Sequence, residues 1–181
     1  MAEIKVTGLD LSYTSTGVAV VQAGAVSVHR LKPPAKLGTS HERIRWLRFG
    51  ICELARGSTH IAIEGAALNA KFGVLKAGVL TGIVQHCLWL ENPDADVVIP
   101  APTNVKQFAI GKGVAEKDEM VATLAVRYQH VARIIGNDVA DALALADMWC
   151  HQLGIPVVPD VPRENQKAAF KGWPYKRFWE L

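Results

Sequence analysis

The sequence predicts a mixed α/β fold with one main sheet, and three observations support this class. Short segments rich in β-branched residues open the chain, helix-like and strand-like segments then alternate, and a late segment is apolar almost all round. With 181 residues, half of them hydrophobic, the chain is long enough to form one domain with a sizeable core. This composition excludes a disordered protein.

The first three strands are expected over residues 4–9, 17–22 and 25–31, where β-branched residues concentrate. A polar turn separates the first two strands, and a tight turn at Gly24 separates the second from the third. Short turns of this kind join antiparallel neighbours, so the three strands should form a meander. Pro33 and Pro34 then end it.

A helix should begin at Thr39 or Ser40, because both residue types cap helices and apolar residues follow them at spacings of three and four. Further strands are expected over residues 59–63 and 96–99. The remaining helices are expected over residues 71–89, 104–109, 116–129 and 136–150.

The composition of the sequence changes after residue 155. Prolines recur at 156, 159, 162 and 174, and basic and aromatic residues are interleaved between them and the end. We therefore divide the chain into a main domain over residues 1–155 and a basic and aromatic tail over residues 156–181. Such a tail either stacks on DNA or docks on the protein's own surface.

Charge and cysteine content restrict the compartment and the partners. The net charge of +3 permits an anionic partner without demanding one. Cys52, Cys87 and Cys150 are widely spaced in apolar stretches, which predicts free thiols in a reducing, cytoplasmic compartment. No apolar run is long enough to cross a membrane, and the N-terminus lacks a signal-peptide pattern.

Four acidic residues occupy positions at which their carboxylates could form one site. Asp10 and Glu64 each end an apolar strand, and Asp138 and Asp141 lie about one turn apart on one face of the last helix. If the two strands are parallel neighbours, all four carboxylates converge, and they then require cations to offset their repulsion. Asp138 and Asp141 are also typical of a helix N-terminal cap, and Asp147 should lie on another face as a solvated or hydrogen-bonded acid.

Oxygen ligands of this kind suit Mg²⁺ or Mn²⁺. Two such ions about 4 Å apart would hold the attacking water and the leaving oxygen of a phosphodiester in line. A converging set of four carboxylates is therefore compatible with hydrolysis of a phosphodiester.

Motifs in the same order resemble the RuvC family of Holliday junction resolvases, whose fold is of the ribonuclease H type. The resemblance covers most of residues 4–153, and its order and spacing are more specific than any single motif. The matching segments are residues 8–10 (GLD) with 15–20 (STGVAV), 61–64 (IAIE), 105–107 (VKQ) with 111–113 (GKG) and 115–117 (AEK), and 138–144 (DVADALA).

The resemblance implies a ribonuclease H-like fold, with a mixed sheet of three antiparallel strands plus parallel strands flanked by helices. It implies that four acids hold two Mg²⁺ ions, for which Mn²⁺ substitutes: Asp10, Glu64, Asp138 and Asp141. It further implies that Lys106 and Lys117 lie near the scissile phosphate, although a lysine in a loop or early helix is otherwise usually solvated. Lys112, between two glycines, is a third candidate phosphate contact.

The resemblance also implies the biology: an intracellular protein, phage-type members included, that resolves four-way DNA junctions during recombination and repair as a homodimer. We expect the dimer contact on the helix that carries Gly78 and Gly82, with packing inside the monomer as the alternative. The family's aromatic residue three positions after the glutamate is Ala67 here. Phe72 either replaces it as a DNA contact or is an ordinary core residue, so strict selectivity for four-way junctions is in doubt.

Three other functions compete with junction resolution. A nuclease acting broadly on forks and flaps would use the same chemistry. A non-catalytic DNA-binding module has little physical reason to keep four clustered acids. Residues 10–20 also resemble the first phosphate loop of the sugar kinase and actin ATPase superfamily, but a second glycine-rich phosphate loop and an adenosine-binding segment are missing from the sequence.

Overall fold

A six-stranded sheet forms the centre of the computed structural model, which describes residues 3–65, 74–114, 116–159, 164–170, 173 and 175–181. The strands are β1 (Lys5–Asp10), β2 (Thr16–Gln22), β3 (Ala25–Leu31), β4 (His60–Ile63), β5 (Asp96–Val98) and β6 (Tyr175–Arg177). Their order across the sheet is β3-β2-β1-β4-β5-β6. The first three strands pair antiparallel, which confirms the predicted meander. β4 is parallel to β1 and β5 is parallel to β4, whereas β6 is antiparallel to β5.

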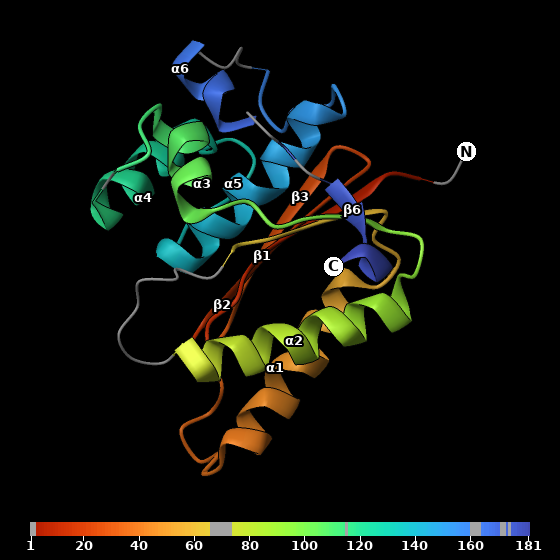
Figure 1. Cartoon of the computed structure of the whole chain (residues 1–181). Coiled ribbons are helices and arrows are strands. Elements are labelled where there is room, and N and C mark those ends of the chain that lie inside the picture. Colours follow the sequence, from red (N-terminus) through yellow and green to blue (C-terminus); the bar gives the residue numbers. More distant parts are fainter. Residues whose placement is uncertain (1–2, 66–73, 115, 160–163, 171–172, 174) are drawn as a thin grey trace.

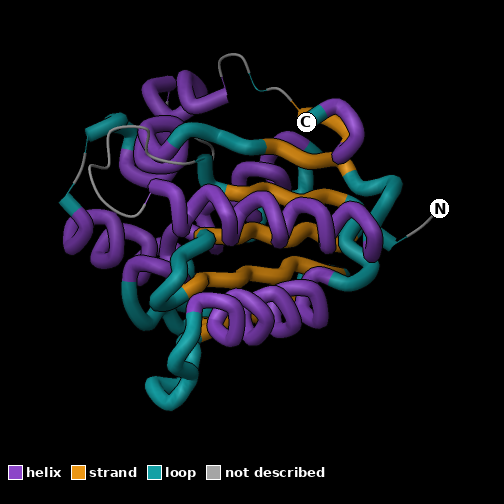
Figure 2. Tube along the Cα trace, turned by 60° about the horizontal axis from the view of Figure 1, so that its bottom comes forward, coloured by secondary structure: helices purple, strands orange, loops and turns teal. Residues whose placement is uncertain are grey.

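Helices cover both faces of this sheet (Figure 1). They are α1 (Ser40–Ala55), α2 (Val74–Glu91), α3 (Pro102–Ile110), α4 (Lys117–Arg127), α5 (Asn137–Gln152) and α6 (Glu164–Lys167), with short 3₁₀ turns η1 (Ala168–Phe170) and η2 (Phe178–Glu180). α1 and α2 pack on one face, and α5 packs on the other together with α3 and α4. Figure 2 brings the first face forward and shows two long helices lying in front of the strands.

The two faces of the sheet carry side chains of different size, because successive residues of a strand point to opposite sides. The face under α1 and α2 carries Leu9, Val18, Val20, Ile61 and Ile63. Alanine and glycine are prominent under α5, for example Gly8, Gly17, Ala19 and Ala62. The helix α5 can therefore lie closer to the sheet than a surface of branched side chains would permit.

Two glycines set the distance between α5 and the sheet. A Cβ atom at Gly17 would lie less than 3.0 Å from the backbone of Asp138, and one at Gly8 would overlap the backbone of Ala142 in the same way. Eleven residues of α5 between Val139 and Cys150 are buried, which confirms the prediction of a helix surrounded by core. Its N-terminal turn is consequently held against the ends of β1 and β2.

Two local predictions are confirmed, the cap of α1 and the free cysteines. Thr39 caps α1 through a capping box with Glu42, in which each side chain accepts a hydrogen bond from the other residue's backbone N–H. The three cysteines are free thiols, two buried and one half-buried. Among the described helices, none is long and apolar enough to cross a lipid bilayer.

The described part of residues 156–181 packs on the main domain. Trp173 meets Trp149 edge-to-face with 5.7 Å between ring centroids, and Phe178 is buried against the α1 and α2 side of the core. β6 adds to β5, where Arg177 Nε forms an ion pair of 3.1 Å with Asp96. These aromatic residues therefore contact the protein itself, while the boundary at residue 155 stays a prediction.

Candidate active site

The pairing of β1 with β4 brings Asp10 and Glu64 to the same edge of the sheet. Leu9 lies opposite Ile63, and the Glu64 N–H donates to the Leu9 carbonyl over 2.9 Å. Asp10 is two residues beyond Gly8, and Glu64 is two residues beyond Ala62, so both acids stand on the face covered by α5. The parallel arrangement that the sequence left as a condition is therefore met.

The first two turns of α5 supply the other two acids to the same pocket. This pocket has a volume of about 350 Å³. Its lining comprises Asp10, Ser12, Glu64, Pro102, Lys106, Met120, Val121, Asn137, Asp138, Ala140 and Asp141. Four acids from three separate elements thus converge with one of the predicted lysines, although their roles stay predictions.

The environment of Asp10 strongly favours its uncharged form. Burial raises the pKa of Asp10 to about 9, and the negative charges of Glu64, Asp141 and Asp138, together with a hydrogen bond to Glu64, add to the effect. At neutral pH Asp10 therefore retains a proton unless a cation takes its place. A bound cation would offset the negative charges of these carboxylates and would stabilise the ionised form of Asp10.

The donor set fits a hard divalent cation, because it consists of carboxylate oxygens around a polar pocket. Within the described segments, however, no group of three acidic, histidine or cysteine side chains forms a ready-made metal cage. Asp10 and Glu64 share a side-chain hydrogen bond, and Asp138 accepts a hydrogen bond from the Ser15 hydroxyl. Metal binding would therefore require the Asp10 proton to leave and some carboxylates to adjust.

Asp138 is held by two residues that sequence analysis did not single out. Ser15 Oγ donates to Asp138 Oδ2 over 2.5 Å, and Arg30 Nε donates to the same oxygen over 3.0 Å. Arg30 Nε also lies 2.9 Å from Ser15 Oγ. The sequence places Arg30 in the predicted strand over residues 25–31, but only the observed register of β2 with β3 places it opposite Gly17.

The interpretation of the two aspartates as a helix cap is not what the structure shows. The N-cap of α5 is Gly136, and no side chain makes a capping hydrogen bond there. Asp138 still lies in the first turn, where a negative charge interacts favourably with the helix dipole. Its hydrogen bonds, however, are made with β-strand and turn residues outside the helix.

The other predicted DNA contacts are distributed differently. Lys106, in α3, lines the pocket, whereas Lys112 forms an ion pair of 2.7 Å with Glu119 and is not among the lining residues. Lys117 is the first residue of α4, but its side chain lies outside the part of the chain that can be described. Phe72 and Ala67 also lie outside the described residues.

Asp147 lies apart from the pocket, as its position on α5 predicted. Its side chain is fully buried, accepts a 2.6 Å hydrogen bond from Tyr128 Oη and accepts another of 2.8 Å from the Val157 N–H. Burial raises the pKa of Asp147, and Arg127 and His151 oppose that rise. Asp147 therefore joins α4, α5 and the segment after α5, which is a structural role.

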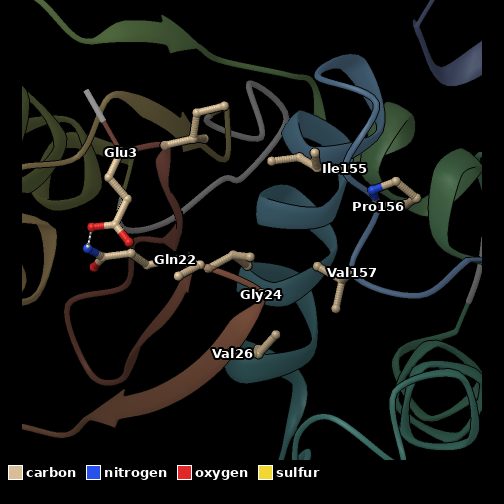
Figure 3. Close-up of a pocket in the computed structure, with 10 residues that line it drawn as sticks. Glu3, Gln22, Gly24, Val26, Ile155, Pro156 and Val157 are labelled. Atoms are coloured by element: carbon tan, nitrogen blue, oxygen red, sulfur yellow. Dashed lines mark hydrogen bonds between the residues drawn. The ribbon is translucent and has the colours of Figure 1, made fainter. Parts of the chain in front are cut away.

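A second hollow, of about 430 Å³, lies at the opposite end of the strands (Figure 3). It is bordered by the turn at Gly24 and by residues 155–157, and the Gln22 side-chain amide donates to Glu3 over 2.9 Å at its rim. Glu3 is its single acidic lining residue. The carboxylate pocket is consequently the stronger candidate for catalysis.

Comparisons with known proteins agree with this geometry. The family model described as "Crossover junction endodeoxyribonuclease RuvC" matches residues 6–151, a range that includes all four pocket acids. No curated protein gives a significant match. A structure of Thermus thermophilus RuvC has 21% sequence identity and a TM-score of 0.64, covering 84% of this chain and 98% of its own. T. thermophilus RuvC in complex with a Holliday junction substrate gives the same identity and coverage with a TM-score of 0.66. These similarities confirm the ribonuclease H-like fold.

Proposed function

Because the chain belongs to the RuvC family of crossover junction endodeoxyribonucleases, we propose that it cleaves branched DNA, above all four-way junctions, at the pocket between β1, β4 and α5. Membership makes the chain a hydrolase of phosphodiester bonds in DNA. The observation that carries the proposal is the convergence of three acids around a fourth, Asp10, whose pKa is raised to about 9. The junction bound by the T. thermophilus protein supports the choice of substrate.

We assign the cation-binding role to Asp10, Glu64, Asp138 and Asp141, with Mg²⁺ as the physiological ion and Mn²⁺ as a substitute. Two divalent ions held by these carboxylates would supply activation of water and stabilisation of the leaving oxygen. The chain's own contribution is to bring together acids that repel one another and to bury Asp10. Lys106, on the pocket wall, is suited to hold phosphate oxygens and to offset negative charge in the transition state.

A second copy of the chain is the proposed partner of α2. Exposed apolar side chains form a stripe along α2: Leu75, Val79 and Ile83 are four residues apart, and Leu90 follows seven residues later on the same side of the helix. Among the described residues, nothing outside α2 lies within 4 Å of the Cβ position of Gly78 or Gly82, so the helix backbone is open to close approach there. An isologous contact through this stripe would pair two pockets for two cuts in one symmetric junction.

Asp138→Asn tests the assignment of the pocket. The amide keeps the size of the side chain but loses the negative charge, so cleavage of a four-way junction in Mg²⁺ should fall by at least about 10³-fold while junction binding persists. Asp118→Asn, which changes an exposed acid in the first turn of α4, is the matched control and should cleave normally. Both proteins should be assayed on four-way junctions, forks, flaps and linear duplex, with Mg²⁺ and with EDTA.

The results separate the competing functions. Cleavage by Asp138→Asn at the wild-type rate, or wild-type cleavage in EDTA, would contradict the metal-binding pocket. Equal rates on forks, flaps and four-way junctions would instead identify a broader branched-DNA nuclease with the same chemistry. Binding of junctions by the wild-type protein without cleavage under any condition would identify a DNA-binding module.

A further inference from the structure

A row of residues crosses the first three strands directly beneath the start of α5. Asp10 is paired with Gly17, and Gly17 is paired with Arg30 on β3. Residues directly opposite each other in antiparallel strands share a face of the sheet. Because Gly17 has no side chain, the backbone of Asp138 occupies the space above it, between Asp10 on one side and Arg30 on the other.

Arg30 uses this position to contact the first turn of α5. Its Nε donates to Asp138 Oδ2 and to Ser15 Oγ, and its Nη1 would lie 3.6 Å from a Cβ atom at Gly136. The Ser15 hydroxyl, which is itself buried, donates to the same Oδ2. Both contacts therefore converge on one oxygen of Asp138.

The other oxygen of Asp138 is in a different situation. Within the described residues, Oδ1 makes no hydrogen bond, although Asp138 lines the carboxylate pocket. An aspartate held by one oxygen cannot rotate freely away from neighbouring carboxylates that repel it. Partners of this kind orient metal-binding side chains in many proteins, and their loss typically costs 10- to 100-fold in metal affinity or activity.

We propose that Arg30 and Ser15 are positioning residues that hold Asp138 by Oδ2 and keep Oδ1 available to a divalent cation. The inference rests on the proposed function, because it assumes that the pocket binds such a cation. The positive charge of Arg30 would by itself oppose cation binding. Its side chain is 46% exposed, however, so solvent and salt screen this repulsion, and orientation of Asp138 is the larger effect.

Calorimetric titration of the DNA-free protein with Mn²⁺ tests the proposal without depending on cleavage. Arg30→Met should weaken Mn²⁺ binding by at least about 10-fold, and Ser15→Ala should weaken it by a smaller factor because the ion pair remains. Arg30→Lys, which keeps the charge but cannot reproduce the Nε contacts, should recover only part of the affinity. Thermal unfolding of each variant establishes that it is folded.

Arg56→Met is the matched control. Arg56 also makes ion pairs, of 2.5 Å with Glu53 and 3.5 Å with Glu91, but it follows α1 at the end of the sheet away from the pocket. Its replacement should leave Mn²⁺ affinity unchanged. In an Asp138→Asn background, Arg30→Met should cause no further loss, because the side chain through which it acts no longer carries a charge.

Two results would overturn the inference. Arg30→Met could bind Mn²⁺ as tightly as the wild type or more tightly, which would mean that charge repulsion outweighs orientation. Arg30→Met could also lower the affinity equally with and without Asp138, which would mean that it acts elsewhere. A wild-type protein that binds no Mn²⁺ would instead overturn the metal-binding pocket of the proposed function, and this inference with it.

Discussion

The two faces of the sheet are built for different purposes. Under α5, glycine and alanine let a helix backbone rest directly on the strands, and the first turns of that helix carry two of the four pocket acids. Under α1 and α2, branched side chains hold the helices further out, and the outer side of α2 exposes an apolar stripe. The face under α5 determines where the pocket acids lie, whereas the helices on the other face expose an apolar surface to solvent.

The glycines make this difference testable, because two of them lie on strands under α5 and two lie in α2 on the other side of the sheet. Gly8 and Gly17 have helix backbone where a Cβ atom would stand. Gly78 and Gly82 have no neighbour there within 4 Å in the part of the chain that the structure describes. The same substitution should therefore have opposite consequences on the two faces.

The largest effect is expected from Gly17→Ala. The added methyl group would overlap the backbone of Asp138, so α5 would have to move away from β2 and would carry the acids with it. We expect a loss of about 2 kcal/mol in the free energy of unfolding, typical of overpacking, and at least about 100-fold in cleavage rate. Urea unfolding and a junction cleavage assay measure the two effects.

Gly82→Ala is the control for that substitution. It adds the same methyl group in the middle of a helix without a steric conflict, and it should stabilise the monomer by up to about 1 kcal/mol. Equal destabilisation by both substitutions would mean that the sheet faces do not differ in the way described. Wild-type cleavage by Gly17→Ala would mean that the distance between α5 and the sheet does not determine activity.

An intermediate effect is expected from Asp10→Asn, measured as stability without metal. The pKa of Asp10 is raised to about 9 in the folded protein, whereas it is about 3.9 in an unfolded chain. Between about pH 4 and pH 9, the folded state therefore binds one proton more than the unfolded state. The stability contributed by that proton is complete below about pH 4 and is lost as pH rises through about 9. At pH 8 in EDTA, the variant should therefore be more stable than the wild type by at least about 1 kcal/mol.

Urea unfolding at pH 5 and pH 8 provides the comparison for Asp10→Asn. The wild type should lose more stability than the variant between the two pH values, and Mg²⁺ should stabilise the wild type at pH 8 far more than the variant. A variant with the same pH dependence as the wild type would contradict the buried, protonated state of Asp10.

The smallest change in monomer stability is expected from a substitution in the exposed apolar stripe of α2. Val79→Glu places a charge in the exposed stripe of α2 and should dissociate the dimer while changing the free energy of unfolding of the monomer by less than about 0.5 kcal/mol. Val126→Glu alters a more exposed valine on α4 and should leave the dimer intact. Sedimentation velocity at micromolar concentration measures both, and a monomeric wild type would rule out the proposed contact.

Much of this architecture follows from local sequence patterns. The strand-ending acids Asp10 and Glu64, the meander and the buried α5 were all predictable, because each rests on short-range alternation or helical periodicity. Predicted boundaries were less exact. α3 begins at Pro102, two residues before the predicted start at residue 104, because proline is well accommodated in the first turn of a helix.

The missed features depend on contacts between distant residues. The hydrogen bonds of Arg30 and Ser15 with Asp138 require both the register of β2 with β3 and the close approach of α5, and no local pattern specifies the two together. Residues 175–177 lie in the predicted basic and aromatic tail, yet they form β6. A strand of three residues that pairs with a distant edge has too little periodicity to be recognised.

That last strand has a consequence for how the protein is made and handled. β6 covers the edge of β5, a row of backbone donors and acceptors that would otherwise be available for pairing with another chain. Until residues 175–177 have been synthesised, the edge of β5 is exposed in the nascent chain. Truncations just upstream of Tyr175 should consequently promote aggregation, even though they leave all four pocket carboxylates in place.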